Sequence, residues 1–281
     1  MSKVAIVTDS TAYIPKDLVD KYHITVVAQV LIWGDETLRD DIDIHPKEFY
    51  TRLTKADIMP TTSQATPADF KEIYEKLHGE GKEILAILLS DLLSKTVNSA
   101  NLAHQMVPDA KVEIVNSTTT AMGLGFHVLA AARAAENGAS LDECAAIARK
   151  SQSKSGVLFA VDTLEFLHRG GRIGGASRFL GTALQLKPIL ELIGGRIEPI
   201  ERVRTKKKAH DRLIEMIVDR VKGKDNIRLA TLHANAAEDA KTLMQRILNE
   251  VEPVEIVRSE VSPVVGAHVG PGTIGVAYIT D

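Results

Sequence analysis

The 281-residue chain contains one cysteine, Cys144, and only 4% of its residues are aromatic. A single thiol excludes an internal disulfide and a metal site built on cysteines, and the surrounding apolar helical spacing predicts a buried core residue. The sequence has no long uninterrupted apolar run, because its most apolar helix, about residues 122–135, includes His127 and Arg133. We therefore predict no membrane span and a cytoplasmic location.

Several signatures of catalysis and nucleotide binding are also missing. The chain has no Gly-x-x-x-x-Gly-Lys-Ser/Thr loop, no Gly-x-Gly-x-x-Gly after a strand and no Gly-x-Ser-x-Gly elbow. Its nine histidines are scattered without metal-ligand spacing, and the net charge of -3 provides no general attraction to nucleic acid. We predict no metal, no cofactor and no nucleic-acid partner.

Residues 1–160 predict an N-terminal α/β domain with a parallel, Rossmann-like sheet and helices on both faces. Short β-branched runs alternate there with helical patterns, which is typical of such sheets. The predicted strands are residues 4–7, 24–32, 84–89, 112–115 and 157–160, and the predicted helices are 15–22, 46–53, 67–77, 95–105, 121–136 and 141–150.

Residues 161–281 predict a C-terminal α+β domain with a mixed or antiparallel sheet, and a ligand is expected at the interface of the domains. Gly194-Gly195 separates the segments 188–193 and 196–203, which predicts a hairpin with a type I′ turn. Helices are expected at 164–169, 177–186, 206–221 and 236–250, and strands at 228–233, 254–258 and 274–279.

Hydroxyl side chains gather where ligands bind in open parallel sheets, beyond the carboxyl ends of strands and at helix starts. The clusters are Thr8-Asp9-Ser10-Thr11, Thr61-Thr62-Ser63-Gln64, Ser90 with Ser94, and Asn116-Ser117-Thr118-Thr119-Thr120. Each one alone is explained by helix capping. Four clusters on one rim favour a neutral polar pocket for a small anionic head group.

Two glycine-rich segments add a histidine and several cations. In the segment 264–275, His268 stands among four glycines and a proline, which is typical of a ligand-presenting loop, although a tight turn before the last strand explains the glycines equally well. In Gly170-Gly171-Arg172-Ile173-Gly174-Gly175, the glycines fit a connection between two helices. The basic residues nearby form either a binding face or a solvated surface: Arg169, Arg172, Arg178, Arg202, Arg204, Lys206, Lys207 and Lys208.

Taken together, these motifs resemble the DegV family, the fatty-acid-binding (FakB-type) subunits of bacterial fatty acid kinase. The resemblance covers the whole chain. It is carried by Thr8-Asp9-Ser10-Thr11, Thr61-Thr62-Ser63-Gln64, Leu93-Ser94-Lys95-Thr96, Thr163-Leu164-Glu165-Phe166-Leu167 before the glycine cluster, Lys187-Pro188-Ile189-Leu190 and Gly266-Ala267-His268-Val269-Gly270-Pro271-Gly272. Two departures are Lys95, where the family usually has glycine, and Asn116, where it often has aspartate.

The resemblance implies a long-chain fatty acid buried between two domains and phosphorylated on its carboxylate by a separate ATP-binding kinase, for phospholipid synthesis. It implies that Thr62, Ser94 and His268 hold the carboxyl group. Supporting positions are Ser63, Asp9, Ser10, Ser117 and Gly266, and the candidates for phosphate contact or kinase docking are Arg172, Arg169, Lys95 and Arg204.

The chain is accordingly predicted to be a lipid-binding subunit with no complete active site of its own. One alternative is an acyl hydrolase or transferase that uses Ser94 and His268, and another is a lipid-sensing interaction protein. Candidates for the tail pocket are Phe179, Leu180, Ala183, Leu184, Leu186, Ile189 and Leu190, although ordinary core packing is the favoured explanation for any one of them.

Overall fold

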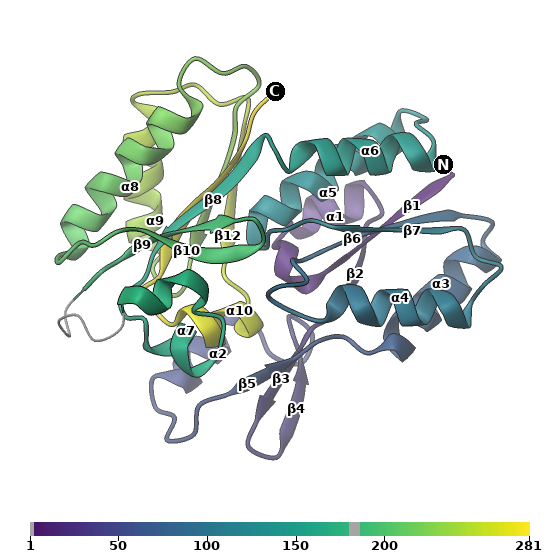
Figure 1. Ribbon diagram of the computed structural model, residues 1–281, viewed down its shortest axis with the longest axis horizontal. Helices are drawn as coiled ribbons and strands as arrows, with labels where there is room; N and C mark the ends of the chain where they lie inside the picture. The colour runs from purple at the N-terminus through teal and green to yellow at the C-terminus, as the bar shows by residue number, and fades with distance from the viewer. Residues whose placement is uncertain (1–2, 180–185) are drawn as a thin grey trace.

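The computed structural model describes residues 3–179 and 186–281, and it arranges the strands of this part of the chain in three sheets (Figure 1). The N-terminal sheet is parallel, in the order β2-β1-β6-β7, and comprises β1 (Val4–Asp9), β2 (Thr25–Val27), β6 (Glu83–Leu88) and β7 (Val112–Asn116). This confirms the parallel sheet predicted from the alternation of strands and helices.

Helices cover both faces of the parallel sheet, as predicted. One face carries α3 (Pro67–Gly79) and α4 (Thr96–Met106), and the other carries α5 (Ala121–Glu136) and α6 (Leu141–Ser151). The division follows strand alternation in β6, since Ile84 and Ala86 pack with the α3 and α4 side whereas Leu85 and Ile87 pack with the α5 and α6 side. Helix α1 (Lys16–Lys21) follows the 3-10 turn η1 (Ser10–Ala12).

The second sheet is six-stranded and mixed, in the order β10-β9-β8-β13-β11-β12. Only the pair of β11 (Arg228–His233) and β12 (Glu255–Glu260) is parallel; β8 (Ser155–Ala160), β9 (Ile189–Ile193), β10 (Arg196–Glu201) and β13 (Ile274–Ile279) pair antiparallel. Its outer face is covered by α8 (Lys206–Val221) and α9 (Ala237–Leu248). Its inner face packs with the α5 side of the first sheet.

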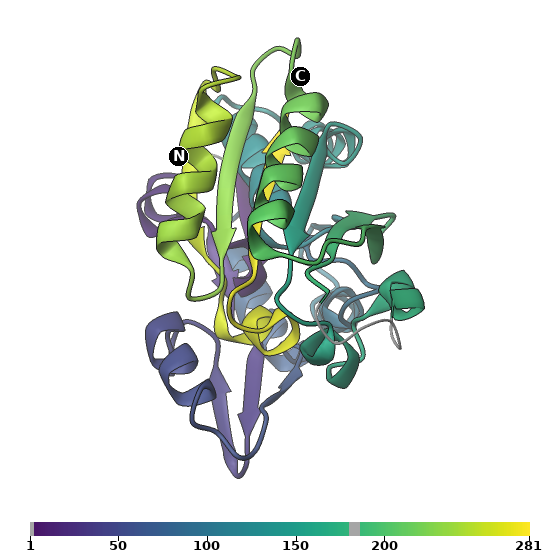
Figure 2. The ribbon, with the colours of Figure 1, turned by 90° about the vertical axis from the view of Figure 1, so that its left-hand side faces the viewer.

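The predicted 24–32 strand is wrong as a single element, because the chain changes sheets within it. Residues 25–27 belong to the parallel sheet, whereas β3 (Val30–Trp33) forms an antiparallel three-stranded sheet with β4 (Glu36–Arg39) and β5 (Thr61–Ser63). Helix α2 (Pro46–Leu53) flanks this small sheet (Figure 2). Thr61-Thr62-Ser63 thus lies on a strand and does not open a helix; α3 begins at Pro67, where Thr66 caps it.

Three further predictions differ from the structure. The 157–160 strand, placed in the N-terminal unit by the sequence, is part of β8 in the six-stranded sheet, where it pairs with β13 and β9; the domain boundary itself stays a prediction. The segment around His268 is not a loop but contains α10 (Pro263–Val269). Of the expected 177–186 helix, residues 177–179 belong instead to the 3-10 helix η2 (Gly174–Phe179), which follows α7 (Glu165–Arg169), and residues 180–185 lie outside the described part of the chain.

The predicted hairpin is confirmed, since β9 and β10 pair across Gly194 and Gly195, whose φ angles are +57° and +85°. None of the helices within residues 3–179 and 186–281 has the length and apolar character needed to cross a membrane.

Candidate ligand cavity

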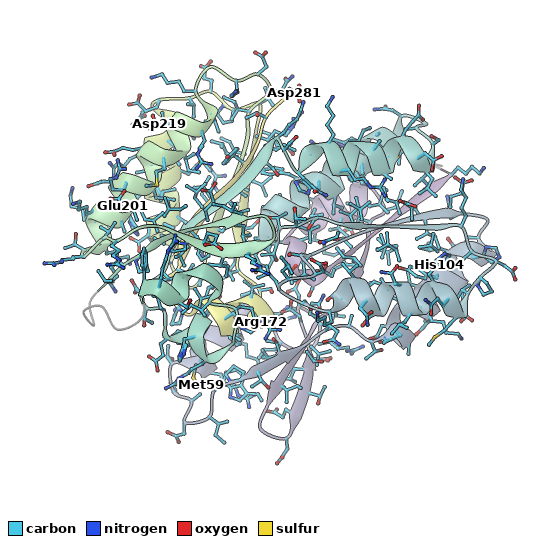
Figure 3. The ribbon with its side chains drawn as sticks, viewed as in Figure 1. Met59, His104, Arg172, Glu201, Asp219 and Asp281 are labelled. Atoms are coloured by element: carbon cyan, nitrogen blue, oxygen red, sulfur yellow. The ribbon has the colours of Figure 1, made fainter. Side chains whose placement is uncertain are left out.

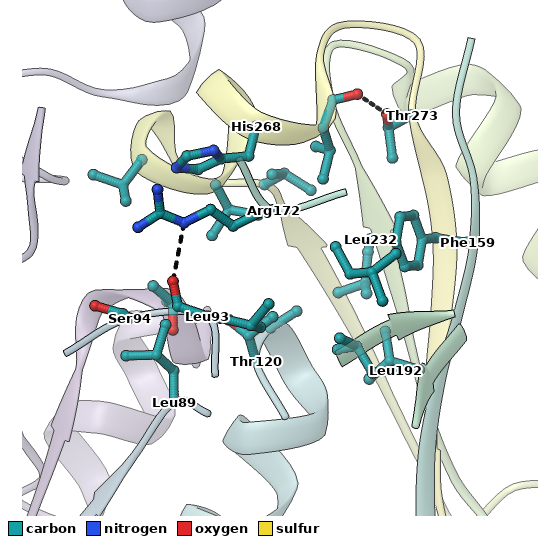
Figure 4. Close-up of a pocket in the computed structure, with 18 of the residues that line it drawn as sticks. Leu89, Leu93, Ser94, Thr120, Phe159, Arg172, Leu192, Leu232, His268 and Thr273 are labelled. Atoms are coloured by element: carbon teal, nitrogen blue, oxygen red, sulfur yellow. Dashed lines mark hydrogen bonds between the residues drawn. The ribbon is translucent and has the colours of Figure 1, made fainter. Parts of the chain in front are cut away.

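A cavity lies between the parallel sheet, the six-stranded sheet and α10, and its empty space, part of it open to solvent, is about 870 Å³ (Figure 4). Polar side chains and one cation line part of the wall: Thr11, Tyr13, Gln29, Thr62, Ser63, Ser94, Thr120, Arg172, His268 and Thr273. Most of the remaining lining is aliphatic, so the cavity suits an elongated molecule with one polar end.

Part of the apolar lining comes from the inner face of the six-stranded sheet. Val157 and Phe159 of β8 point inward at alternate positions, and Leu192, Ile197 and Leu232 come from three other strands. Figure 4 shows Phe159, Leu192 and Leu232 on the side of the cavity away from His268. An apolar chain that starts near His268 would therefore be buried against this sheet.

Thr62 and His268 meet at the polar end. Thr62 Oγ1 lies 2.7 Å from His268 Nε2, although β5 and α10 are far apart in the sequence. Burial, reinforced by the nearby positive charge of Arg172, lowers the pKa of His268 to about 4. The ring is thus neutral near pH 7, and its buried Nδ1 atom has no hydrogen-bond partner among the described residues.

Close packing fixes the position of α10 and of the His268 ring. Helix α10 starts with Pro263 in its first turn, and Gly266 faces the side chains of Phe49 and Tyr50 at a distance that leaves no room for a Cβ atom. Gly170 packs directly on the imidazole, where a Cβ atom would overlap Nδ1. The glycines flagged by the sequence therefore permit close approach of side chains to the backbone.

Arg172 extends into the polar end from the connection between α7 and η2. Its Nε donates to the carbonyl of Leu93 at 3.0 Å and its Nη1 to the carbonyl of Gly170 at 2.8 Å. Figure 4 shows its guanidinium between His268 and Leu93, and Figure 3 shows the residue beside α10 near the centre of the molecule. Burial lowers the pKa of Arg172, yet the group remains a cation at neutral pH.

Ser94 lies in the segment between β6 and α4 and lines the same end of the cavity. Its Oγ is 2.9 Å from Thr96 Oγ1, and among the described hydrogen bonds it makes none with His268. The neighbouring Lys95 is exposed, serves as the N-cap position of α4 and is absent from the cavity wall. The Lys95 side chain therefore does not line the polar end of the cavity.

The structure brings together Thr62, Ser63, Ser94, His268 and Arg172 around the cavity, but it places the other sequence candidates elsewhere. Asp9 accepts hydrogen bonds from Thr11 and from the Leu89 backbone, and Ser117 bonds within its own turn. Ser10 bonds to Asp40 and Gly266 packs against α2. These residues support the surrounding backbone and do not contact the cavity.

The predicted cations other than Arg172 lie at the surface. Arg169 is paired with Glu165 on α7, and Arg204 is exposed just before α8. Of the tail candidates, Ile189 and Leu190 are buried in β9 and do not line the cavity. Phe179 of η2 is buried and Leu186 is partly buried, and neither lines the cavity. Leu180, Ala183 and Leu184 lie outside the described residues.

Several lining residues were missed by the sequence analysis. Gln29 and Tyr13 occur in no motif, and Leu192, Leu232 and Phe159 look like ordinary strand residues until the sheet order is known. For the strand residues, the sequence offers one indication: side chains on the same face of a strand occupy every second position. Across residues 3–179 and 186–281, no group of three or more metal-ligating side chains is positioned to hold a metal ion.

Comparison with known proteins gives a match over nearly the full chain. A family model described as "Uncharacterised protein, DegV family" matches residues 3–281. A DegV domain-containing protein of Streptomyces coelicolor is 41% identical over 275 residues, which cover 97% of each chain. Protein DegV of Bacillus subtilis is 34% identical over 276 residues, or 98% of each chain.

Two solved structures have nearly the same fold. A DegV family protein from Thermus thermophilus, whose structure is described as one of fatty acid binding, has a TM-score of 0.94 and 35% sequence identity over 100% of both chains. DegV from Bacillus subtilis, described as a fatty acid binding protein, has a TM-score of 0.92 and 32% identity, again over 100% of both chains.

Proposed function

Because the chain belongs to the DegV family, we propose that it binds a long-chain fatty acid and presents the carboxylate to a separate ATP-dependent kinase. The carboxylate oxygen attacks the γ-phosphorus of ATP, the bond from that phosphorus to the ADP oxygen breaks, and ADP leaves. The resulting acyl phosphate enters phospholipid synthesis. We propose the cytoplasm as the compartment and assign no cofactor to this chain.

The observation that carries this proposal is that one cavity is polar at one end and mostly apolar along the rest of its wall. Thr62, Ser94 and His268 line the same end as Arg172, while the inner face of the six-stranded sheet supplies apolar walls. Each buried methylene contributes about 0.8 kcal/mol, so ten of them supply roughly 8 kcal/mol before the costs of association. The tail accounts for affinity, and the polar end has to orient the carboxylate.

The carboxyl-binding groups suit a nucleophile that must stay reactive. Hydroxyls and a neutral imidazole hydrogen-bond a carboxylate without forming a permanent ion pair with it. We propose that Arg172, already at the polar end, pairs with the added charge of the acyl phosphate. The exposed Lys95, Arg169 and Arg204 are our candidates for contact with the phosphate or the kinase.

The contacts of Ser94 count against an acyl hydrolase or transferase. A nucleophilic serine requires a base within hydrogen-bond reach, whereas the described partner of Ser94 is Thr96 and His268 bonds to Thr62. Turnover of acyl esters by the isolated protein, abolished by Ser94→Ala, would contradict the proposal and favour the hydrolase.

Native mass spectrometry of the purified protein, followed by denaturation and identification of released lipid, tests binding directly. We expect one fatty acid per chain; a protein that is empty and takes up no added fatty acid contradicts the proposal. Binding without acyl-phosphate formation by kinase and ATP would instead favour a lipid sensor.

A double variant tests the proposed phosphate contact. With the kinase present, Arg172→Ala combined with Lys95→Ala should abolish acyl-phosphate formation, and an unchanged yield would show that neither residue is needed to bind the phosphate.

A further inference from the structure

The three proposed carboxyl-binding side chains come from three separate segments, so other residues must fix their spacing. Thr62 lies on β5, Ser94 precedes α4 and His268 lies on α10. Of these, only Thr62 and His268 are joined by a described hydrogen bond, and Ser94 bonds to Thr96 instead. A carboxylate that is to meet all three groups requires the segments to be held together behind the cavity.

Gln29 connects two of these segments. Its Oε1 accepts a hydrogen bond from the backbone N–H of Ala65, just after β5, at 3.1 Å. Its Nε2 donates to Thr96 Oγ1 at 3.0 Å, and Thr96 Oγ1 lies 2.9 Å from Ser94 Oγ. The side chain is 2% exposed and lines the cavity, at the point where the chain passes from β2 to β3.

Ser10 and Asp40 extend the connection to the third segment. Ser10 Oγ accepts from the backbone N–H of Gln29 at 3.1 Å and donates to Asp40 Oδ2 at 2.6 Å. Asp40 Oδ1 accepts from the backbone N–H of Val264 at 3.1 Å, in the first turn of α10, one turn before His268. Asp40 is 1% exposed, so these hydrogen bonds are shielded from water.

We propose that Gln29, Ser10 and Asp40 are positioning residues for the fatty acid carboxylate. Their hydrogen bonds hold β5, the start of α4 and the start of α10 at the spacing that lets Thr62, Ser94 and His268 meet one ligand head group. This inference rests on the proposed fatty acid binding.

The physical argument is one of geometry. Burying an amide and a carboxylate is unfavourable unless each is hydrogen-bonded, and apolar side chains would pack three segments without that penalty. Apolar contacts tolerate sliding, whereas short hydrogen bonds with fixed donors and acceptors do not. A satisfied polar connection therefore fixes relative positions more tightly than aliphatic packing does.

The test compares two ligands with the same tail, octadecanoic acid and octadecan-1-ol. Lipid is first removed from the full-length protein, and the dissociation constant of each ligand is then measured by displacement of a fluorescent fatty acid. Gln29→Leu and Asp40→Leu should weaken binding of the acid about tenfold and binding of the alcohol about twofold or less. The ratio of the two constants reports on the head group, because any tail or folding defect affects both ligands.

Three more conservative variants keep the test decisive where a leucine variant fails to fold. Thr96→Val removes the hydroxyl between Gln29 and Ser94 with little change of shape, and it should raise the ratio of the dissociation constant of the acid to that of the alcohol. Thr96→Ser and Asp40→Asn keep hydrogen-bonding groups in place and should leave this ratio close to its wild-type value. Gln105→Leu and Asp109→Leu, at exposed positions, are the matched controls.

The outcomes separate the inference from the proposed function. An equal loss for acid and alcohol, or no loss for either, would show that these residues do not position the carboxylate. Leu232→Ala, in the apolar wall, should weaken both ligands equally and serves as the reference for a tail effect. A wild-type protein that binds neither ligand would refute the proposed function itself, independently of any variant.

Discussion

Thr62 and His268 are 206 residues apart in the sequence, and their Oγ1 and Nε2 atoms lie 2.7 Å apart. Their contact joins the small three-stranded sheet to the short helix that precedes the last strand. Both side chains line the cavity, so the contact brings the two parts of the chain together at the point where a ligand head group would bind.

Gly170→Ala should disrupt this contact. The added Cβ would overlap Nδ1 of His268, and the ring would have to move away from Thr62. Because the φ angle of Gly170 is an ordinary -75°, the effect is steric and not one of backbone strain. We expect fatty acid affinity to fall about tenfold and the free energy of unfolding to fall by about 1–3 kcal/mol.

Isothermal titration calorimetry and urea unfolding measure these two effects. Gly79→Ala is the matched control, since Gly79 ends α3 and a Cβ there meets nothing within 4 Å. That variant should bind normally and be slightly stabilised. A Gly170→Ala protein with unchanged affinity would show that the position of the His268 ring does not matter for binding.

Removal of the Arg172 cation should raise the pKa of His268. Burial is the larger cause of its lowered pKa, and the charge of Arg172 adds to it, so the Arg172→Gln variant retains part of the shift. NMR titration of the His268 ring measures the change. Arg169→Gln, at an exposed position paired with Glu165, should leave that pKa unaltered; an equal response in both variants would contradict a local effect of Arg172.

The sequence predicts the elements that depend on local pattern. The βα alternation of the N-terminal half and the Gly194-Gly195 hairpin are both found, because apolar periodicity and positive φ angles are local properties. The family motifs likewise lead to Thr62, Ser94 and His268, which the structure places around one cavity.

Long-range pairing decides the features that the sequence does not reveal. Strand β8 joins the second sheet because it pairs with β13 at the other end of the chain, which no local pattern indicates. Gln29 breaks an apolar run and looks like a minor interruption, yet it marks the change of sheet and bonds to Ala65 and Thr96. His268 lies on a helix in which Gly266 permits close packing, whereas Gly270 and Gly272, with φ angles of +75° and +80°, belong to the turn that leads from α10 to β13.

The free energy of unfolding should fall as Asp40 loses its proton with rising pH. Burial raises its pKa from 3.8 to about 6, despite hydrogen bonds from Ser10 and Val264, and Asp41 adds repulsion. The folded state therefore binds the proton more tightly than the unfolded state, and the free energy of unfolding falls between about pH 4 and pH 6. The shift corresponds to about 3 kcal/mol. The other titratable groups facing the carboxyl are Tyr13 and Tyr50, which stay protonated in this range.

Comparison with Asp40→Asn isolates this contribution. The buried His127 and His268, whose pKa values lie near 4, change stability in the opposite direction over the same range, but they cancel when the two proteins are subtracted. Urea unfolding at several pH values should show the wild-type protein losing stability relative to the variant from pH 4 to pH 7. A constant difference would mean that Asp40 titrates alike in the folded and unfolded states.

Leu232→Phe should shorten the space available to a ligand tail. Leu232 is buried on β11 in the apolar wall, and the larger ring occupies volume that the terminal methylenes of a long chain would fill. Because each buried methylene contributes about 0.8 kcal/mol, the variant should lose affinity for octadecanoic acid while retaining most of its affinity for dodecanoic acid. Competition between the two acids measures the shift in preference. Equal weakening of both acids would mean that the substitution disturbs the polar end, and unchanged preference would mean that the tail lies along another part of the wall.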